Sequence, residues 1–343
     1  MTTQQIDAPP SPTAPAPVSA LASAPPLIAA IDIGGTKIAG GLVDPDGTLM
    51  YQARRPTPAD EPGVAVLKAV YEVVDLLAAD PRWGRVAGLG IGSAGPLDLA
   101  RGTVSPVNIP GWRDFPLVRS VTEHPAVTGL PTVLGGDAVA MAAAEHWCGA
   151  ARGHTNALCL VVSTGVGAGL ILDGAVYPGP TGNAGHLGHI SVDLDGDPCA
   201  CGSRGCVEGL ASGTAITRRA LNEGWRPGGT GAPAGASAAA VAASARAGDP
   251  IALAAFDRAA QALAAGIAAV AALIEIEVAV VGGGVAEAGD VLFAPLRKHL
   301  GTYAALPFAA GIAVVPARLG TDAGLIGAAA LALPSALQTT GLR

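Results

Sequence analysis

Two short glycine-containing segments have the composition of phosphate-binding turns. Residues 32–37 (DIGGTK) combine two glycines with a carboxylate, a hydroxyl and a cation, and residues 163–169 (STGVGAG) place two hydroxyls before three glycines. Glycine lets a phosphate approach the backbone closely, so that successive N–H groups can point toward it. Neither segment is the GxxxxGK[ST] loop of P-loop proteins, and each alone could be a tight hairpin turn. Together they indicate that one phosphate chain is held from two sides.

A third glycine cluster, residues 282–284, follows an apolar run at 277–281 that is typical of a strand. Adenine or ribose could lie against it, although three glycines can also form a sharp turn from strand to helix. The three clusters together define a predicted nucleotide site. Its residues are Asp32, Gly34, Gly35, Thr36, Lys37, Ser163, Thr164, Gly165, Gly283 and Gly284.

Asp137 stands between a predicted strand at 131–134 and a predicted Ala-rich helix at 138–149. An Asp in this place is commonly the N-cap of the helix, and that is the structural interpretation of the residue. The functional interpretation is a catalytic base. The two are compatible, because a cap position also holds the carboxylate at the mouth of a cleft.

Three cysteines and a histidine form the clearest metal-binding pattern. Cys199, Cys201 and Cys206 fall within eight residues, and His189 precedes them. Three thiolates and one imidazole complete the tetrahedral shell of a structural zinc site and leave no open position for a reaction. Clustered cysteines in a chain without an export signal favour a metal over disulfides, and reduced, buried cysteines are the alternative. We therefore predict a structural zinc ion.

His186 lies three residues before His189 in the run GNAGHLGH. If this segment is helical, the two imidazoles share a face. One can then bind zinc while the other faces a pocket. The alternative is a histidine with a purely structural role.

The elements that must position these residues alternate between strands and helices, which predicts an α/β protein. Apolar runs flank both glycine turns, so each turn is predicted to join two strands of a hairpin. The repeat of this layout, early and midway, predicts two related domains. We place a first domain at 27–134, a second at 135–320 with the zinc loop, and a last helix at 321–334 that packs back on the first domain.

Composition limits the other classes of protein. Half of the residues are apolar, 14% are charged and the net charge is −7, with no Lys/Arg run of the kind that binds nucleic acid. The most apolar stretch, 262–274, is too short to span a bilayer and predicts a buried helix. No signal peptide is visible, so we expect a cytoplasmic enzyme without membrane partners. The Pro/Ala-rich residues 1–26 are predicted to be a disordered tail.

The motifs DIGGTK, SAGPLD, STGVGAG, AGHLGH and CACGSRGCVE together resemble the ROK family (repressor, open reading frame, kinase) over about residues 27–334. The cysteine element after the AGHLGH run is highly specific to that family, whereas a DxGGT turn alone indicates only the wider actin, Hsp70 and sugar-kinase superfamily. The resemblance implies a ribonuclease-H-like, actin-type ATPase fold, with two α/β domains around a cleft that holds ATP and Mg²⁺. It also implies a sugar acceptor and, frequently, a homodimer.

By position, Asp137 corresponds to the catalytic Asp of the family, which takes the proton of the sugar 6-hydroxyl. The zinc ligands of the family correspond to His189 and the three clustered cysteines. The predicted sugar-binding residues are Gly95, Asn108, His186 and Glu208.

The chain departs from the usual family pattern at two positions. Gly136 stands where most members have Asn before the catalytic Asp, and His186 stands where most have Glu. The AGHLGH run is similar to that of some bacterial N-acetylmannosamine kinases, which favours N-acetylmannosamine over glucose. The alternatives are a glucokinase, a sugar-responsive repressor of the same family, and a zinc-stabilised sugar-binding protein without catalysis. Residues 1–26 are not expected to hold a DNA-binding module, which argues against the repressor.

Overall fold

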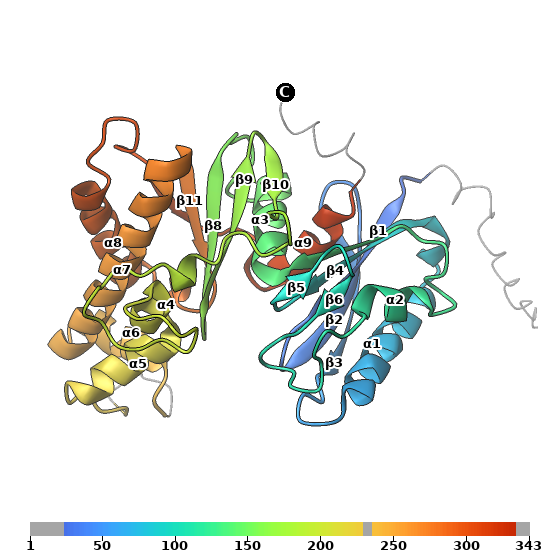
Figure 1. Ribbon diagram of the computed structural model, residues 1–343, viewed down its shortest axis with the longest axis horizontal. Coiled ribbons are helices and arrows are strands. Elements are labelled where there is room, and N and C mark those ends of the chain that lie inside the picture. The colour runs from blue at the N-terminus through green and yellow to red at the C-terminus, as the bar shows by residue number, and fades with distance from the viewer. Residues whose placement is uncertain (1–23, 229–234, 334–343) are drawn as a thin grey trace, which may run out of the picture.

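The computed structural model describes residues 24–228 and 235–333, and it contains two lobes, each built around one five-stranded sheet (Figure 1). The predicted tail at 1–26 lies almost entirely outside the described residues. The first sheet has the order β3-β2-β1-β4-β7 and the second the order β10-β9-β8-β11-β12. These two orders are the same topology, so the predicted duplication is confirmed. The predicted domain boundary at 134/135 stays a prediction.

The strands of the two sheets have these bounds: β1 Leu27–Ile33, β2 Lys37–Val43, β3 Leu49–Pro56, β4 Val86–Ser93, β7 Thr132–Gly136, β8 Ala157–Val162, β9 Val166–Leu172, β10 Ala175–Tyr177, β11 Val278–Gly282 and β12 Ala313–Pro316. A small ribbon, β5 (Leu97–Asp98) with β6 (Thr103–Val104), stands apart from both. In each sheet the first two strands form an antiparallel hairpin, and the later strands run parallel to the first. Both glycine turns are therefore hairpin turns, as predicted.

Helices cover the sheets. The described helices are α1 Gly63–Ala78, α2 Leu117–Thr122, α3 Asp137–Cys148, α4 Val207–Ala211, α5 Gly213–Asn222, α6 Ala238–Arg246, α7 Pro250–Ile274, α8 Asp290–Tyr303 and α9 Ala323–Leu331, with short 3₁₀ turns η2 Trp83–Arg85, η3 Leu187–His189, η4 Ala286–Ala288 and η5 Gly320–Asp322. The predicted helices at 138–149 and 321–334 correspond to α3 and α9. Helix α7 is long and apolar enough to cross a membrane, but much of it is buried against α4, α5, α6 and α8, which is typical of a core helix.

The strand period decides which face each residue of β1 uses. Leu27, Ala29 and Ile31 lie in the core cluster that includes α1, whereas Ile28 and Ala30 lie in the cluster formed with α9. Successive side chains of a strand point to opposite faces, so Asp32 continues the even-numbered series toward α9. One register slip would put this carboxylate into the α1 core.

The lobes meet at two helices that pack on each other. Helix α3 lies on β8 and β9 of the second sheet, α9 lies on β1, β2, β4 and β7 of the first, and the two helices form an extensive mutual contact (Figure 1). Gly327 of α9 makes this possible, because a Cβ atom there would overlap the carbonyl oxygen of Ala140 in α3. The small residues of both helices thus let their backbones approach closely.

Candidate active site

Asp32 lies near the end of β1 with its carboxylate against the start of α9. A Cβ atom at Gly324 would lie 2.5 Å from Asp32 Oδ2. Burial, and to a smaller extent the nearby charge of Asp137, raises the pKa of Asp32 to about 6 against a lowering by Lys37. Asp32 also lies close to α3, the helix that Asp137 begins, because a Cβ atom at Gly92 would be 3.7 Å from Asp32 Oδ1 and 3.8 Å from the Ala140 Cβ.

The first glycine turn joins β1 to β2 and lies against Asn108. The Gly34 N–H donates to the Lys37 carbonyl at 3.0 Å and closes the turn. A Cβ atom at Gly35 would lie 2.7 Å from Asn108 Nδ2, so only glycine leaves room for this amide. The predicted sugar-binding Asn108 therefore contacts the predicted phosphate-binding turn directly.

The second glycine turn joins β8 to β9 and lies against Glu208. The Ser163 N–H donates to the Gly165 carbonyl at 2.8 Å. Glu208 Oε2 accepts the N–H of Val166 at 2.9 Å, and a Cβ atom at Gly165 would lie 2.6 Å from the same oxygen. In each lobe, then, a predicted sugar-binding side chain touches the glycine turn.

Asp137 is the first residue of α3, and the N-cap position belongs to Gly136. The predicted N-cap role of Asp137 is therefore wrong: β7 continues to Gly136, whose extended backbone makes the transition to the helix. Asp137 Oδ1 accepts the N–H of Ala138 at 2.7 Å. Its carboxylate still reaches solvent on one side, while the protein on the other sides raises its pKa by desolvation; the Ala138 N–H and His186 lower it.

Asp137 lines a small pocket of about 60 Å³. Gly95 comes from the first lobe and His186 from the second, and both line this pocket. Asn108 and Glu208 do not line it, but each is held at a glycine turn. The structure thus places Gly95 and His186 in the pocket of Asp137, and Asn108 and Glu208 each at a glycine turn.

Asn183 also lines this pocket, and the sequence analysis did not single it out. Its Nδ2 donates to the Leu97 carbonyl at 2.7 Å and its Oδ1 accepts the Leu97 N–H at 3.2 Å. The amide therefore joins the 182–186 loop of the second lobe to β5 beside the first. In the sequence, Asn183 could have been found as the polar residue between two glycines of the GNAGH run.

A larger cavity of about 640 Å³ opens beside the second glycine turn, in the size range of small-molecule sites. Ser163, Thr164 and Gly284 line it, together with residues of α5 and α6. Gly283 has φ +86°, and a Cβ atom there would overlap the Val162 carbonyl. The third glycine cluster is therefore a sharp turn that brings bare backbone to the rim of a cavity large enough for a nucleoside.

The predicted zinc ligands lie together. The ligand atoms of His189, Cys199, Cys201 and Cys206 are all within 4.8 Å of one another. The sulfurs of Cys201 and Cys206 are 3.8 Å apart, and Cys199 Sγ is 3.9 Å from His189 Nδ1. Zn–S bonds of about 2.3 Å at tetrahedral angles require sulfurs separated by about 3.8 Å, so the four groups fit zinc.

The His186 ring stacks near the His189 ring, with centroids 6.0 Å apart and planes inclined by 18°. His189 belongs to η3 and His186 precedes it directly. One imidazole therefore faces the sulfur cluster while the other lines the Asp137 pocket. This is the arrangement expected from the three-residue spacing.

The ROK family model matches residues 28–335. The chain belongs to the ROK family. A glucokinase of Thermotoga maritima is 36% identical over 88% of this chain and 95% of its own length, and an N-acetylmannosamine kinase of Citrobacter koseri is 39% identical over 88% and 97%. The crystal structure of a ROK family glucokinase from Streptomyces griseus, in complex with glucose and AMPPNP, is 35% identical, covers 89% of this chain and 99% of that one, and has a TM-score of 0.74. The actin-like ATPase fold expected from the resemblance is confirmed.

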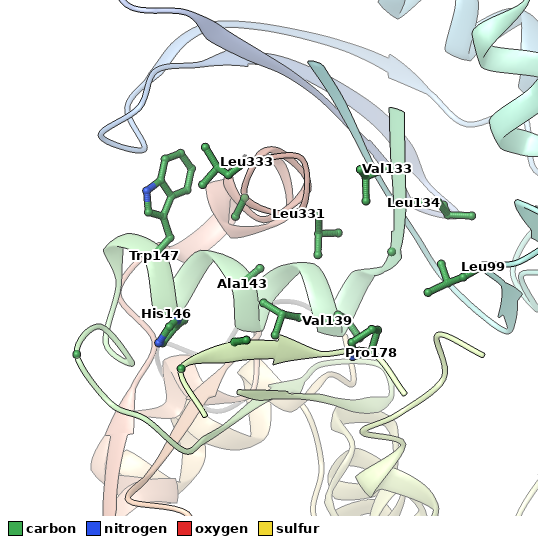
Figure 2. Close-up of a pocket in the computed structure, with 16 residues that line it drawn as sticks. Leu99, Val133, Leu134, Val139, Ala143, His146, Trp147, Pro178, Leu331 and Leu333 are labelled. Atoms are coloured by element: carbon green, nitrogen blue, oxygen red, sulfur yellow. The ribbon is translucent and has the colours of Figure 1, made fainter. Parts of the chain in front are cut away.

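A third cavity in this ROK protein, of about 270 Å³, lies along α3 and α9 (Figure 2). Figure 2 shows Val139 and Trp147 of α3 and Leu331 of α9 around it, with Leu99 and Leu134 at the far end. The polar side chain among them is His146, whose Nε2 is 3.1 Å from the His154 carbonyl oxygen. An apolar lining offers no set of hydrogen-bonding groups for sugar hydroxyls, so we place no substrate there.

Proposed function

We propose that this ROK sugar kinase transfers the γ-phosphoryl group of ATP to the 6-hydroxyl of a hexose, with Asp137 as the catalytic base and N-acetylmannosamine as the preferred acceptor. One observation carries the proposal. Asp137 stands at the mouth of a pocket to which both lobes contribute, and the protein around its partly solvent-exposed carboxylate raises its pKa by desolvation. A base whose pKa lies closer to neutrality than that of an ordinary carboxylate is well suited to take a proton from an alcohol.

In the proposed reaction, an ionised Asp137 accepts the proton of the sugar 6-hydroxyl as that oxygen attacks the γ-phosphorus. The bond between the γ-phosphorus and the β–γ bridging oxygen breaks, and ADP leaves. Bound Mg²⁺ would neutralise charge on the β- and γ-oxygens, and Asp32 is the carboxylate placed to hold it, directly or through water. Phosphoryl transfer depends mainly on such positioning and charge stabilisation.

The donor site is proposed from the two hairpin turns. Backbone N–H groups and hydroxyls at Gly34, Gly35 and Thr36 would contact the phosphates from the first lobe, with Lys37 beside them. Ser163, Thr164 and Gly165 would do so from the second. The nucleoside would occupy the cavity bordered by Gly283 and Gly284, which supports this assignment by its size and its position next to Ser163 and Thr164.

The acceptor site is proposed to use Gly95, Asn108, His186 and Glu208. Preference for N-acetylmannosamine rests on His186 and on Gly136, which leaves the wall beside Asp137 without a side chain and gives space for an acetamido group. The glucokinase of Thermotoga maritima and the N-acetylmannosamine kinase of Citrobacter koseri are similar to this chain to nearly the same degree. Glucose is therefore the second candidate acceptor.

Zinc is proposed to support the acceptor site without taking part in the reaction. The cluster of His189 and three cysteines would keep the loop rigid between His186 and Glu208, which lie on either side of it in the sequence. The homodimer and the cytoplasmic location remain predictions.

The decisive experiment measures ADP release with a panel of hexoses for the wild type and for D137N. The amide keeps the size of the carboxylate but cannot accept the proton, so kcat should fall by about 10²–10⁴-fold while calorimetry shows nearly unchanged sugar binding. Normal turnover in D137N, or no turnover by the wild type with any sugar, would refute the kinase mechanism. A kcat/KM for glucose above that for N-acetylmannosamine would overturn the acceptor assignment alone.

A further inference from the structure

The polypeptide passes between the lobes at two places within the described residues from β7 onward. The first passage is from β7 into α3, and the second runs through residues 317–322 from β12 into α9. Each leads directly into one of the two central helices. Asp137 begins α3, and Gly324 near the start of α9 lies against the Asp32 carboxylate. The relative placement of α3 and α9 therefore sets the relative placement of the two carboxylates.

Glu145 of α3 connects these two passages. Its side chain is fully buried, with 0% exposure. Its Oε1 accepts the N–H groups of Arg318 at 3.0 Å and Leu319 at 3.1 Å, and its Oε2 accepts the N–H of Ala150 at 2.6 Å. All three donors are backbone groups, and no ion pair with Glu145 exists within residues 24–228 and 235–333.

Packing alone does not explain this residue. A buried carboxylate is costly unless it is well hydrogen-bonded, and the C-terminal end of a helix disfavours a negative charge. An apolar side chain of similar size would fill the space but leave two consecutive N–H groups of the second passage without partners. The carboxylate thus fixes the backbone at 318–319, four to five residues before α9 begins, to the last turns of α3.

We propose that Glu145 is a positioning residue for phosphoryl transfer: it clamps the second interlobe passage to α3 and so keeps Asp137 in register with Asp32 while the lobes close. The proposal rests on the proposed roles of those two carboxylates. It assigns to Glu145 no contact with substrate. The chemistry at Asp137 depends on distance, and a misplacement of about 1 Å can cost about 10²-fold in rate.

The test compares E145Q with E277Q. Glu277 is the control, since its Oε1 also accepts two consecutive N–H groups, those of Thr155 and Asn156, at 3.1 and 3.2 Å, but entirely within the second lobe. It differs from Glu145 in being about half exposed and in its ion pair with His154. In E145Q the side-chain NH₂ cannot accept a hydrogen bond, so at least one of the three backbone N–H groups loses its acceptor. We expect kcat to fall at least about tenfold with less than about twofold change in adenosine Kd, because the proposed nucleoside cavity is lined by the second lobe. E277Q should keep kcat within about twofold.

An unchanged kcat in folded E145Q, or a parallel loss of kcat and adenosine affinity, overturns the proposal. If E145Q does not fold, the same comparison uses E145D, which keeps the charge but shortens the reach. Hydrogen exchange on the wild type needs no variant: the amides of Arg318 and Leu319 should stay protected with and without sugar and AMPPNP, and rapid exchange contradicts a clamp. D137N separates the two proposals, since an active D137N refutes the base assignment whatever Glu145 does.

Discussion

The two hairpins have the same topology, but one equivalent position carries a carboxylate in the first and an apolar side chain in the second. In the first lobe, Asp32 is the penultimate residue of β1 and faces α9. In the second lobe, Val161 is the penultimate residue of β8 and packs in the cluster formed with α3. The turns differ in length as well, since Ile33 pairs with Ile38 but Val162 pairs with Val166.

This difference indicates that the glycine turns of the two lobes have different roles. The Asp32 carboxylate beside the first glycine turn can bind a cation. Val161 at the equivalent place gives the second turn no charge from its own strand. The second turn receives its carboxylate from elsewhere in the chain, because Glu208 of α4 accepts the Val166 N–H. The first hairpin thus carries a carboxylate on its own strand, whereas the second hairpin is bonded to a carboxylate from a separate helix. The following predictions test that difference.

The largest effect is expected for D32N. The amide cannot replace a carboxylate as a cation ligand, so kcat should fall by about 10²–10³-fold, the range seen when one electrostatic group is removed. Turnover is measured by ADP release over a range of Mg²⁺ concentrations. D173N is the control, because Asp173 lies in the turn between β9 and β10 of the second lobe and should tolerate the same change. Equal activity of D32N and the wild type would show that the hairpins do not differ in function.

The sequence predicted these hairpins well because both signals are local. The apolar runs predicted β1, β2 and β8 closely, whereas β9 begins at Val166, inside the segment 163–169 that was predicted as the turn. The cysteine spacing predicted that Cys199, Cys201 and Cys206 lie together. The contacts of Asn108 with Gly35 and of Glu208 with Val166 join distant segments, and no local pattern encodes them. Glu145 was missed for the same reason, although a second carboxylate among the apolar residues of α3 was a usable sign.

Removal of zinc should have the second largest effect, because only the second lobe carries the cluster. We expect the sugar KM to rise by about 10–100-fold in C206S, as for the loss of outer support at other metal sites, with a lower Tm. Metal analysis of the purified wild type should give one zinc per chain. C148S is the control, since Cys148 lies at the end of α3 outside the cluster. A wild type without zinc, or equal behaviour of C206S and C148S, contradicts the assignment.

The pH dependence tests the charge of the first hairpin, and comparison with D32N separates it from that of Asp137, whose pKa is also raised. The raised pKa of Asp32, about 6, predicts that kcat/KM falls about tenfold for each pH unit below 6, as the carboxylate becomes protonated. The sign for stability is opposite. A folded-state pKa above the ordinary 3.8 means that the folded protein holds the proton more tightly, so stability is lost as pH rises from about 4 to 6. Calorimetry of D32N should lack that loss, and identical pH profiles for the two proteins would contradict it.

The smallest effect is expected for E208Q, and it separates two roles of one side chain. The glutamine oxygen can still accept the Val166 N–H, so the second turn should keep its shape and KM for ATP should change little. A sugar hydroxyl bonded to the other oxygen would lose a charged acceptor, which is worth about 1 kcal/mol net and raises the sugar KM about fivefold. E223Q, at the exposed end of α5, controls for the loss of one charge. A rise in KM for ATP without a rise for the sugar would instead mean that Glu208 serves the glycine turn, as the second lobe's substitute for Asp32.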